Sequence, residues 1–160
     1  MINLFTNDHQ QLLSAMIKNK VDFMLVGGYA VIYYGYDRNT GDMDVWLKTG
    51  NENRDKLINA LKDFGIVDEH LDTLRQMDFT NPVPVFYLGN VPRKIDFITM
   101  ISNVHFEDAI QQVNYIRLEE MEIPVIHYKQ LILSKLTSSR LKDKADIEEL
   151  QRINKYKNRE

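Results

Sequence analysis

The sequence predicts an α/β (α+β) fold, in which helices flank a sheet of parallel and antiparallel strands. Short apolar runs suited to buried strands alternate with longer segments of helical periodicity. The pair Gly27-Gly28 breaks the chain after the first strand-like run, and an apolar helical segment follows it. A second turn signal, Gly89-Asn90, separates two later strand-like runs and predicts a hairpin. This succession of strands and helices favours a mixed sheet with helices packed against it.

Composition narrows the class of protein. With 160 residues, of which 44% are hydrophobic, the chain can bury the core of a single domain spanning residues 1–160. A formal net charge of −3 is not typical of a general nucleic-acid-binding protein. The absence of cysteine excludes disulfides and thiolate metal sites. No signal-peptide pattern and no apolar run of membrane-spanning length occurs, so we expect a cytoplasmic protein with no membrane association.

Helix and strand signals alternate through the first half of the chain. Apolar residues at helical spacing predict the helices, and short apolar or alternating runs predict the strands. Polar residues before a helix and glycine after it mark the helix ends. The predicted elements are a helix capped by Thr6 or Asn7 and ending at Lys18, a strand 21–26, a helix 29–36, a strand from Asp42 to Leu47, and a helix 52–64 that Asn51 caps and Gly65 ends.

The second half has weaker signals at first and two clear helices at its end. His127 precedes the first of these helices, and we expect it to end a strand or cap the helix. The predicted elements are a helical segment 70–77, an irregular segment 78–84, strands 83–88 and 94–98, a helix 106–113, strands 115–118 and 123–126, a helix 128–136, and a helix from 139 towards 154, with a frayed tail from about 152 to 160.

Two carboxylates open the second predicted strand. Side chains alternate between the faces of a strand, so Asp42 and Asp44 share one face and Met43 lies on the other. Like charges held this close repel one another unless a cation lies between them. Mg²⁺ prefers such hard oxygen ligands and keeps open positions for substrate phosphates. The pair therefore predicts a divalent metal site.

A third carboxylate, Asp96, stands alone among apolar residues of the strand 94–98. A lone carboxylate in an apolar strand is costly unless it is paired or binds a metal. One interpretation is a salt bridge to Lys94, which lies on the same face. The other is a third acid of the same site, and the pair at Asp42 and Asp44 favours it.

The glycine turn and the loop after the first apolar helix predict contacts to an anion. Gly27 and Gly28 lead into a helix N-terminus, where free N–H groups and the helix dipole favour negative charge. In the polar loop 37–41, the guanidinium of Arg38 suits phosphate geometry. The alternative for Arg38 is a surface pair with Asp37.

This arrangement of a Gly-Gly turn, a short helix and Asp-x-Asp resembles the nucleotidyltransferase superfamily built on the DNA polymerase β palm. The nearest resemblance is to small stand-alone members related to abortive-infection and toxin–antitoxin nucleotidyltransferases. It implies a palm-like fold and a nucleoside triphosphate substrate. The chain departs from many members by carrying a tyrosine where they have a serine near the glycines. The residues implied are Asp42, Asp44 and Asp96 as catalytic ligands of Mg²⁺ or Mn²⁺, and Gly27, Gly28, Tyr29, Arg38 and Thr40 as nucleotide contacts.

A second resemblance lies in the segment 135–147. Lys135, Arg140 and the run Lys142-Asp143-x-x-Asp146-Ile147 resemble the Lys … Arg-Asp-x-x-Asp-Leu element of the stand-alone family, with a lysine where arginine is frequent. The resemblance implies that Lys135 contacts the nucleotide phosphates and that Asp143 lies near the active site. The alternative is an ordinary amphipathic helix in which Lys142 and Asp146 form an i,i+4 pair.

Two functions follow as hypotheses. The first is an enzyme that moves a nucleoside monophosphate from a triphosphate to an acceptor hydroxyl and releases pyrophosphate, with two metal ions stabilising the entering and leaving oxygens. The acceptor is a protein hydroxyl, a tRNA end or a small alcohol. The alternative is a binding module of the same fold that acts through a partner, such as one half of a toxin–antitoxin pair. A purely structural domain leaves the three acids unexplained.

Overall fold

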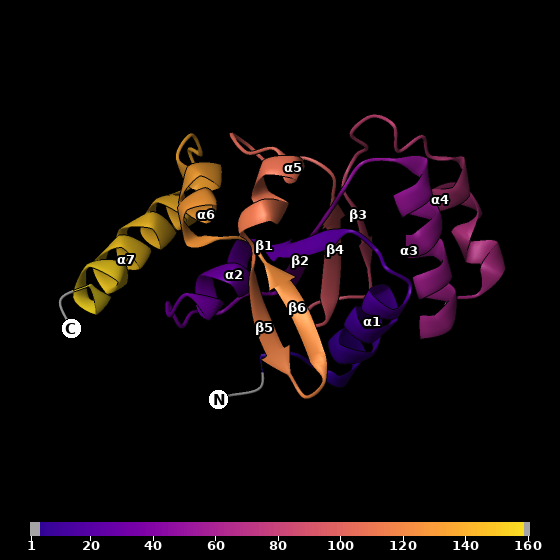
Figure 1. Cartoon of the computed structure of the whole chain (residues 1–160), viewed down its shortest axis with the longest axis horizontal. Coiled ribbons are helices and arrows are strands. Elements are labelled where there is room, and N and C mark those ends of the chain that lie inside the picture. Colours follow the sequence, from indigo (N-terminus) through magenta and orange to yellow (C-terminus); the bar gives the residue numbers. More distant parts are fainter. Residues whose placement is uncertain (1–3, 159–160) are drawn as a thin grey trace.

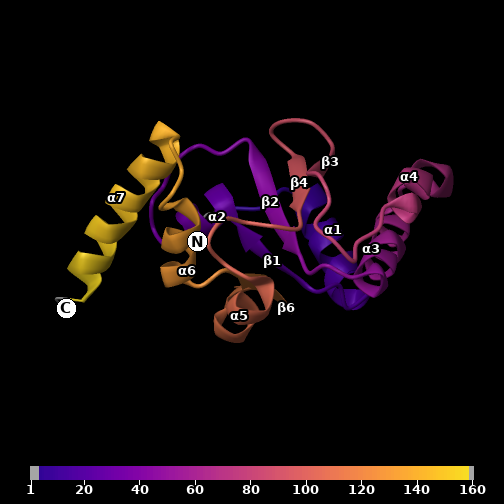
Figure 2. The same ribbon diagram turned by 90° about the horizontal axis from the view of Figure 1, so that it is seen from above.

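The computed structural model describes residues 4–158 and is built around a six-stranded sheet of order β3-β4-β2-β1-β6-β5. Figure 1 shows the pair α6 and α7 at one end of the molecule and the pair α3 and α4 at the other, with the sheet between them, and Figure 2 shows the same separation from above. The strands are β1 (Phe23–Val26), β2 (Asp42–Leu47), β3 (Phe86–Leu88), β4 (Lys94–Ile98), β5 (Asn114–Leu118) and β6 (Met121–Val125). The helices are α1 (Asn7–Lys18), α2 (Gly27–Tyr33), α3 (Asn51–Phe64), α4 (Asp72–Gln76), α5 (Phe106–Ala109), α6 (Tyr128–Lys135) and α7 (Leu141–Lys157), with short 3-10 turns at Asp68–Leu71 and Ile110–Gln112.

The sheet is mixed, which confirms the predicted fold class. The strand β1 pairs antiparallel with β2 and parallel with β6, whereas β2 pairs parallel with β4. The hairpins β3–β4 and β5–β6 are antiparallel, as the turn signal at Gly89-Asn90 predicts for the first of them. A mixed sheet flanked by helices is consistent with a polymerase β-like palm. None of the described helices is long and apolar enough to cross a membrane.

The two faces of the first half of β2 differ in burial because apolar and acidic side chains alternate there, whereas Trp46, the next residue after Asp44 on the acidic face, is buried against Phe106. Met43, Val45 and Leu47 are fully buried in the core, together with the apolar residues of α1 and α3. On the other face, the residues Asp42 and Asp44 are only partly buried. The alternation thus gives the sheet one face that joins the core and one face that carries the acids.

Helix ends largely follow the predicted signals. The hydroxyl of Thr6 accepts the N–H of His9 and caps α1, and the imidazole of His127 accepts the N–H of Lys129 and caps α6. Gly65 ends α3 in a left-handed conformation with φ of 112°. These observations confirm the first alternative for the α1 cap and the capping role of His127.

Several element boundaries differ from the prediction. Asn51 is the first residue of α3 rather than its cap, and its side-chain oxygen accepts the N–H of Phe79 at 2.8 Å. The strand predicted over 83–88 begins only at Phe86, because the proline nitrogens before it cannot donate to a strand partner. The helix α7 continues to Lys157 instead of fraying from about residue 152. The last part of that predicted tail, residues 159–160, lies outside the described residues.

Candidate active site

The register between β2 and β4 brings the three predicted acids to one face of the sheet. Asp44 is the partner of Asp96, and Asp42 is the partner of Lys94, in neighbouring parallel strands. Partners in register point their side chains to the same face. The strands are separated in the sequence by the whole crossover that contains α3, so only the fold can place these carboxylates together.

The environment of Asp44 disfavours its negative charge. Burial, followed by the nearby charges of Asp96 and Asp42, raises the pKa of this carboxyl group from 3.8 to about 6. The cations of Lys135 and Arg140 oppose this shift without cancelling it. The side chain of Asp44 makes no hydrogen bond or ion pair with any residue that the structure describes. A carboxylate in this position is therefore available to bind a cation.

Asp42 contributes a second oxygen without a partner. Its Oδ1 is buried and has no hydrogen-bond partner among the described residues. A buried acceptor without a donor costs about 1–3 kcal/mol unless a ligand satisfies it. The free oxygens of Asp42 and Asp44 are the hard donors that a divalent ion such as Mg²⁺ prefers.

The third acid is already paired. The ammonium of Lys94 lies 3.2 Å from Oδ1 of Asp96 and 3.9 Å from Oδ2 of Asp42. The hydrogen bond to Asp96 raises the pKa of Lys94. The predicted salt bridge to Lys94 is therefore confirmed, and because Asp96 also lies beside Asp44 in register, its role as a third acid of the site stays a prediction. Among residues 4–158, no three His, Cys, Asp or Glu side chains form a group arranged to hold a metal ion.

We call the face that carries Asp42, Asp44 and Asp96 the acid site. The packing of this site requires the glycine turn at Gly27 and Gly28. Gly27 has φ of +63°, and a Cβ atom built on it would lie 2.0 Å from Oδ2 of Asp44. A Cβ atom on Gly28 would lie 2.5 Å from the hydroxyl oxygen of Thr40. That hydroxyl donates to the carbonyl oxygen of Asp42 at 3.2 Å. The two glycines therefore let the acid strand and its preceding loop pack against the start of α2, and a phosphate contact at this turn stays a prediction.

Substitution of Gly27 tests this packing. Gly27→Ala should destabilise the protein by about 1–3 kcal/mol from backbone strain alone. The clash with the carboxylate of Asp44 should add to this cost. We expect chemical denaturation to show a larger loss for Gly27→Ala in the wild-type background than in an Asp44→Ala background. Equal losses of unfolding free energy in the two backgrounds would show that the Asp44 carboxylate does not pack against Gly27.

The side chain of Tyr29 lies in the core, and a nucleotide contact from this residue stays a prediction. It is 5% exposed, and its ring packs against Phe5 and His9. Its hydroxyl lies 3.5 Å from Nδ1 of His9. Burial, followed by the charge of Asp42, raises the pKa of Tyr29. The aromatic ring of Tyr29 therefore has a packing role between Phe5 and His9.

Arg38 makes a buried ion pair, and its contact to a phosphate stays a prediction. Its guanidinium donates to both carboxylate oxygens of Asp146, at 2.7 Å and 2.9 Å. The side chain of Asp146 is 1% exposed and that of Arg38 is 12% exposed. The expected surface pair with Asp37 is wrong, as is the expected i,i+4 pair between Lys142 and Asp146. Arg38 instead fastens the loop before β2 to α7.

Lys135 and Asp143 belong to the same buried ion cluster. The ammonium of Lys135 lies 2.8 Å from Oδ1 of Asp143 and 3.1 Å from Oδ2 of Asp146. Burial alone raises the pKa of Asp143, but hydrogen bonds from Lys135, Ser138 and Arg140 lower it well below its usual range. We define this ion cluster as Arg38, Lys135, Arg140, Asp143 and Asp146.

The ion cluster lies close enough to the acids to influence them, because Lys135 and Arg140 both act on the pKa of Asp44. The side chain of Arg140 is 75% exposed, so it is the member most open to a ligand. The sequence analysis did not name Arg140 or Asp146 as site residues. The three-residue spacing of Asp143 and Asp146 indicated that both lie on one side of the first turns of α7.

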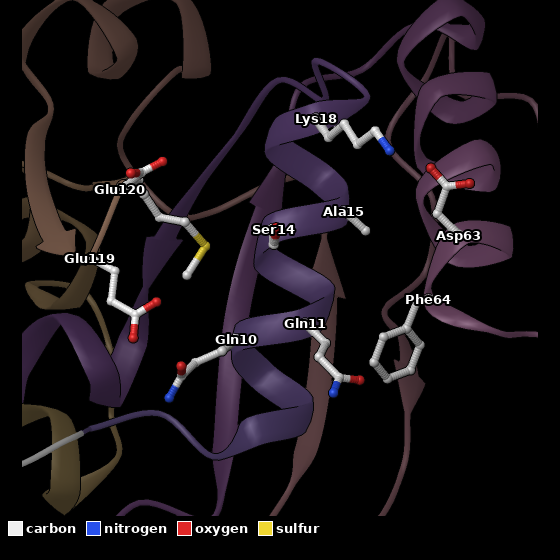
Figure 3. A pocket seen from close by; sticks show the side chains of 10 residues that line it. Gln10, Gln11, Ser14, Ala15, Lys18, Asp63, Phe64, Glu119 and Glu120 are labelled. Carbon is white, nitrogen blue, oxygen red and sulfur yellow. The ribbon is translucent and has the colours of Figure 1, made fainter.

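A polar cavity of about 790 Å³ lies elsewhere, between α1, the end of α3 and the turn that joins β5 to β6 (Figure 3). Figure 3 shows Lys18 pointing towards Asp63, and Glu119 and Glu120 across from Gln10. None of the predicted site residues lines this cavity. The cavity is therefore separate from the acid site.

A comparison with curated proteins found no match. A family model described as "Nucleotidyltransferase of unknown function (DUF6036)" matches residues 3–157. Because this match covers nearly the full 160 residues, the chain belongs to this family of nucleotidyltransferases of unknown function.

Proposed function

We propose that the protein transfers a nucleoside monophosphate from a nucleoside triphosphate to an acceptor hydroxyl, with release of pyrophosphate and with the help of a divalent ion. The observation that carries this proposal is the register of Asp44 with Asp96, beside Oδ1 of Asp42, which is buried without a hydrogen-bond partner among the described residues. Membership of a nucleotidyltransferase family supports the same reaction class.

The residues fit a divalent ion in their donor chemistry. Oδ1 of Asp42 is buried without a hydrogen-bond partner, and Asp44 carries an unfavourable charge, so a cation between them would relieve both. When bound, Mg²⁺ or Mn²⁺ supplies neutralisation of phosphate charge and alignment of the reacting groups. Asp42 and Asp44 would hold the ion.

The other residues have roles that follow from their positions. Asp96 lies beside Asp44, where it can accept the proton of the attacking hydroxyl. The attacking oxygen forms a bond to the α-phosphorus, and the bond from the α-phosphorus to the bridging oxygen breaks, so that pyrophosphate leaves. Arg140 is exposed beside the acids and can contact the phosphates of the triphosphate. Lys135, Arg38 and Asp143 hold the surrounding structure through their ion pairs.

A pyrophosphate-release assay tests this function. The protein is incubated with each of the four common nucleoside triphosphates and with Mg²⁺ or Mn²⁺, alone and with a lysate that supplies protein, tRNA and small-molecule acceptors. We expect release that needs the divalent ion and an acceptor fraction. A protein that gains thermal stability from a triphosphate and a divalent ion but releases no pyrophosphate in any fraction would instead be a binding module. The link to a toxin–antitoxin partner stays a prediction from the resemblance.

A further inference from the structure

Lys94 is the one cation that directly contacts two of the three acids among the described residues. Its ammonium lies between Oδ1 of Asp96, at 3.2 Å, and Oδ2 of Asp42, at 3.9 Å. It also lies 5.0 Å from the centre of the Tyr87 ring. The position is set by the backbone, because Lys94 is the register partner of Asp42 and Tyr87 is the register partner of Asp96.

The acids are thereby divided into two sets. Among the described residues, no cation contacts the carboxylate of Asp44 or Oδ1 of Asp42. The ammonium of Lys94 contacts Asp96 and Oδ2 of Asp42. Mg²⁺ binds its oxygen ligands at about 2.0–2.1 Å, so an ion bridging Asp42 and Asp96 would need the space that the ammonium fills. Two cations in that space would also repel one another strongly.

We propose that Lys94 takes the place of a second divalent ion, so that the site binds one divalent ion at Asp42 and Asp44 and uses the Lys94 ammonium beside Asp96. This inference rests on the proposed function. One divalent ion together with one ammonium balances the formal charge of the three carboxylates. It departs from the two-metal arrangement that the resemblance implies.

A tethered ammonium has a physical advantage over a second bound ion. It is positioned by β4 and by the cation–π contact with Tyr87, so no free ion has to be captured from solution. Lys94 is a positioning residue in this account: it places Asp96 and supplies positive charge near the acceptor oxygen. The dependence of the reaction on divalent ion concentration should then follow a single class of sites.

The test counts Mn²⁺ ions bound per chain by electron paramagnetic resonance, with a triphosphate analogue that cannot be cleaved between the α- and β-phosphates. The variants are wild type, Lys94→Met, Lys94→Arg and a control, Lys48→Met, which removes an exposed lysine just beyond the end of β2. Mn²⁺ bound by the analogue alone is subtracted. We expect one ion in wild type, Lys94→Arg and Lys48→Met, and two ions in Lys94→Met.

Melting curves without metal provide a second readout. Lys94→Met leaves Asp96 and Asp42 without their cation, so its melting temperature should fall below that of wild type, and Mn²⁺ should raise it by a larger amount than in wild type. Two ions bound to the wild-type protein, or one ion bound to a folded Lys94→Met variant, would overturn the inference while leaving transfer intact. Absence of Mn²⁺ binding in wild type, together with absence of pyrophosphate release, would overturn the proposed function as well.

Discussion

Asp44→Asn should abolish transfer and at the same time stabilise the metal-free protein. Losing one ligand of the divalent ion removes several kcal/mol of transition-state stabilisation, which corresponds to a rate loss on the order of a thousandfold. The free energy of unfolding of the metal-free variant should be higher than that of wild type, because an amide at position 44 carries no charge next to Asp96 and Asp42. Pyrophosphate release and urea denaturation, the latter with a chelator present, measure the two effects.

The stability difference between Asp44→Asn and wild type should depend on pH with a defined sign. The folded-state pKa of Asp44 is raised from 3.8 to about 6, so the folded protein binds this proton more tightly than the unfolded chain does. The wild-type protein should therefore lose stability relative to the variant as pH rises from about 4 to about 6, and the difference should be constant above that range. We expect a plateau of about 1–3 kcal/mol in favour of the variant.

A variant that is less stable than wild type at pH 8 would contradict this account of Asp44. Asp108→Asn serves as a control, because Asp108 is exposed on α5 and carries no contact to the acids. Its stability should follow that of wild type across the whole pH range.

Lys135→Met should cost about 3–5 kcal/mol of stability, which is the cost of leaving buried charges without their partner. The ammonium of Lys135 is the shared partner of Asp143 and Asp146, and all three side chains are at most 8% exposed. The sequence resemblance implied instead that the main role of Lys135 is a phosphate contact. The buried ion cluster indicates that stability is the larger effect.

Lys129→Met is the matched control for this prediction, since Lys129 is an exposed lysine on the same helix, α6. Chemical denaturation should show a stability change near zero for the control. If Lys135→Met is as stable as the control and only the KM for the triphosphate rises, the ammonium acts on the nucleotide and not on the fold.

The three acids could be selected from the sequence because each has a local signal, whereas their meeting depends on the register of β2 with β4. Strand alternation puts Asp42 and Asp44 on one face, and the lone acid in the apolar run 94–98 marks Asp96. The Gly27-Gly28 turn was also visible, although its role in accommodating Asp44 depends on a contact that only the fold creates.

The ion cluster could not be predicted in the same way, because its partners are distant in the sequence. Arg38 and Asp146 are 108 positions apart, so the nearer Asp37 offered the simpler pairing. A helical pattern also allowed Lys142 to pair with Asp146, but the packing of α7 buries Asp146 and leaves Lys142 exposed. Tertiary packing thus decided between alternatives that local spacing left open.

The fate of two phosphate labels distinguishes transfer of a nucleoside monophosphate from other reactions of a triphosphate. The wild-type protein and Asp44→Asn are incubated with the triphosphate, divalent ion and acceptor fraction that release pyrophosphate, with the label at the α-phosphate in one sample and at the γ-phosphate in another. We expect wild type to place the α-label on an acceptor and the γ-label in pyrophosphate, and Asp44→Asn to do neither. Transfer of the γ-label to an acceptor or its release as inorganic phosphate, with the α-label left in a nucleoside diphosphate, would contradict this expectation.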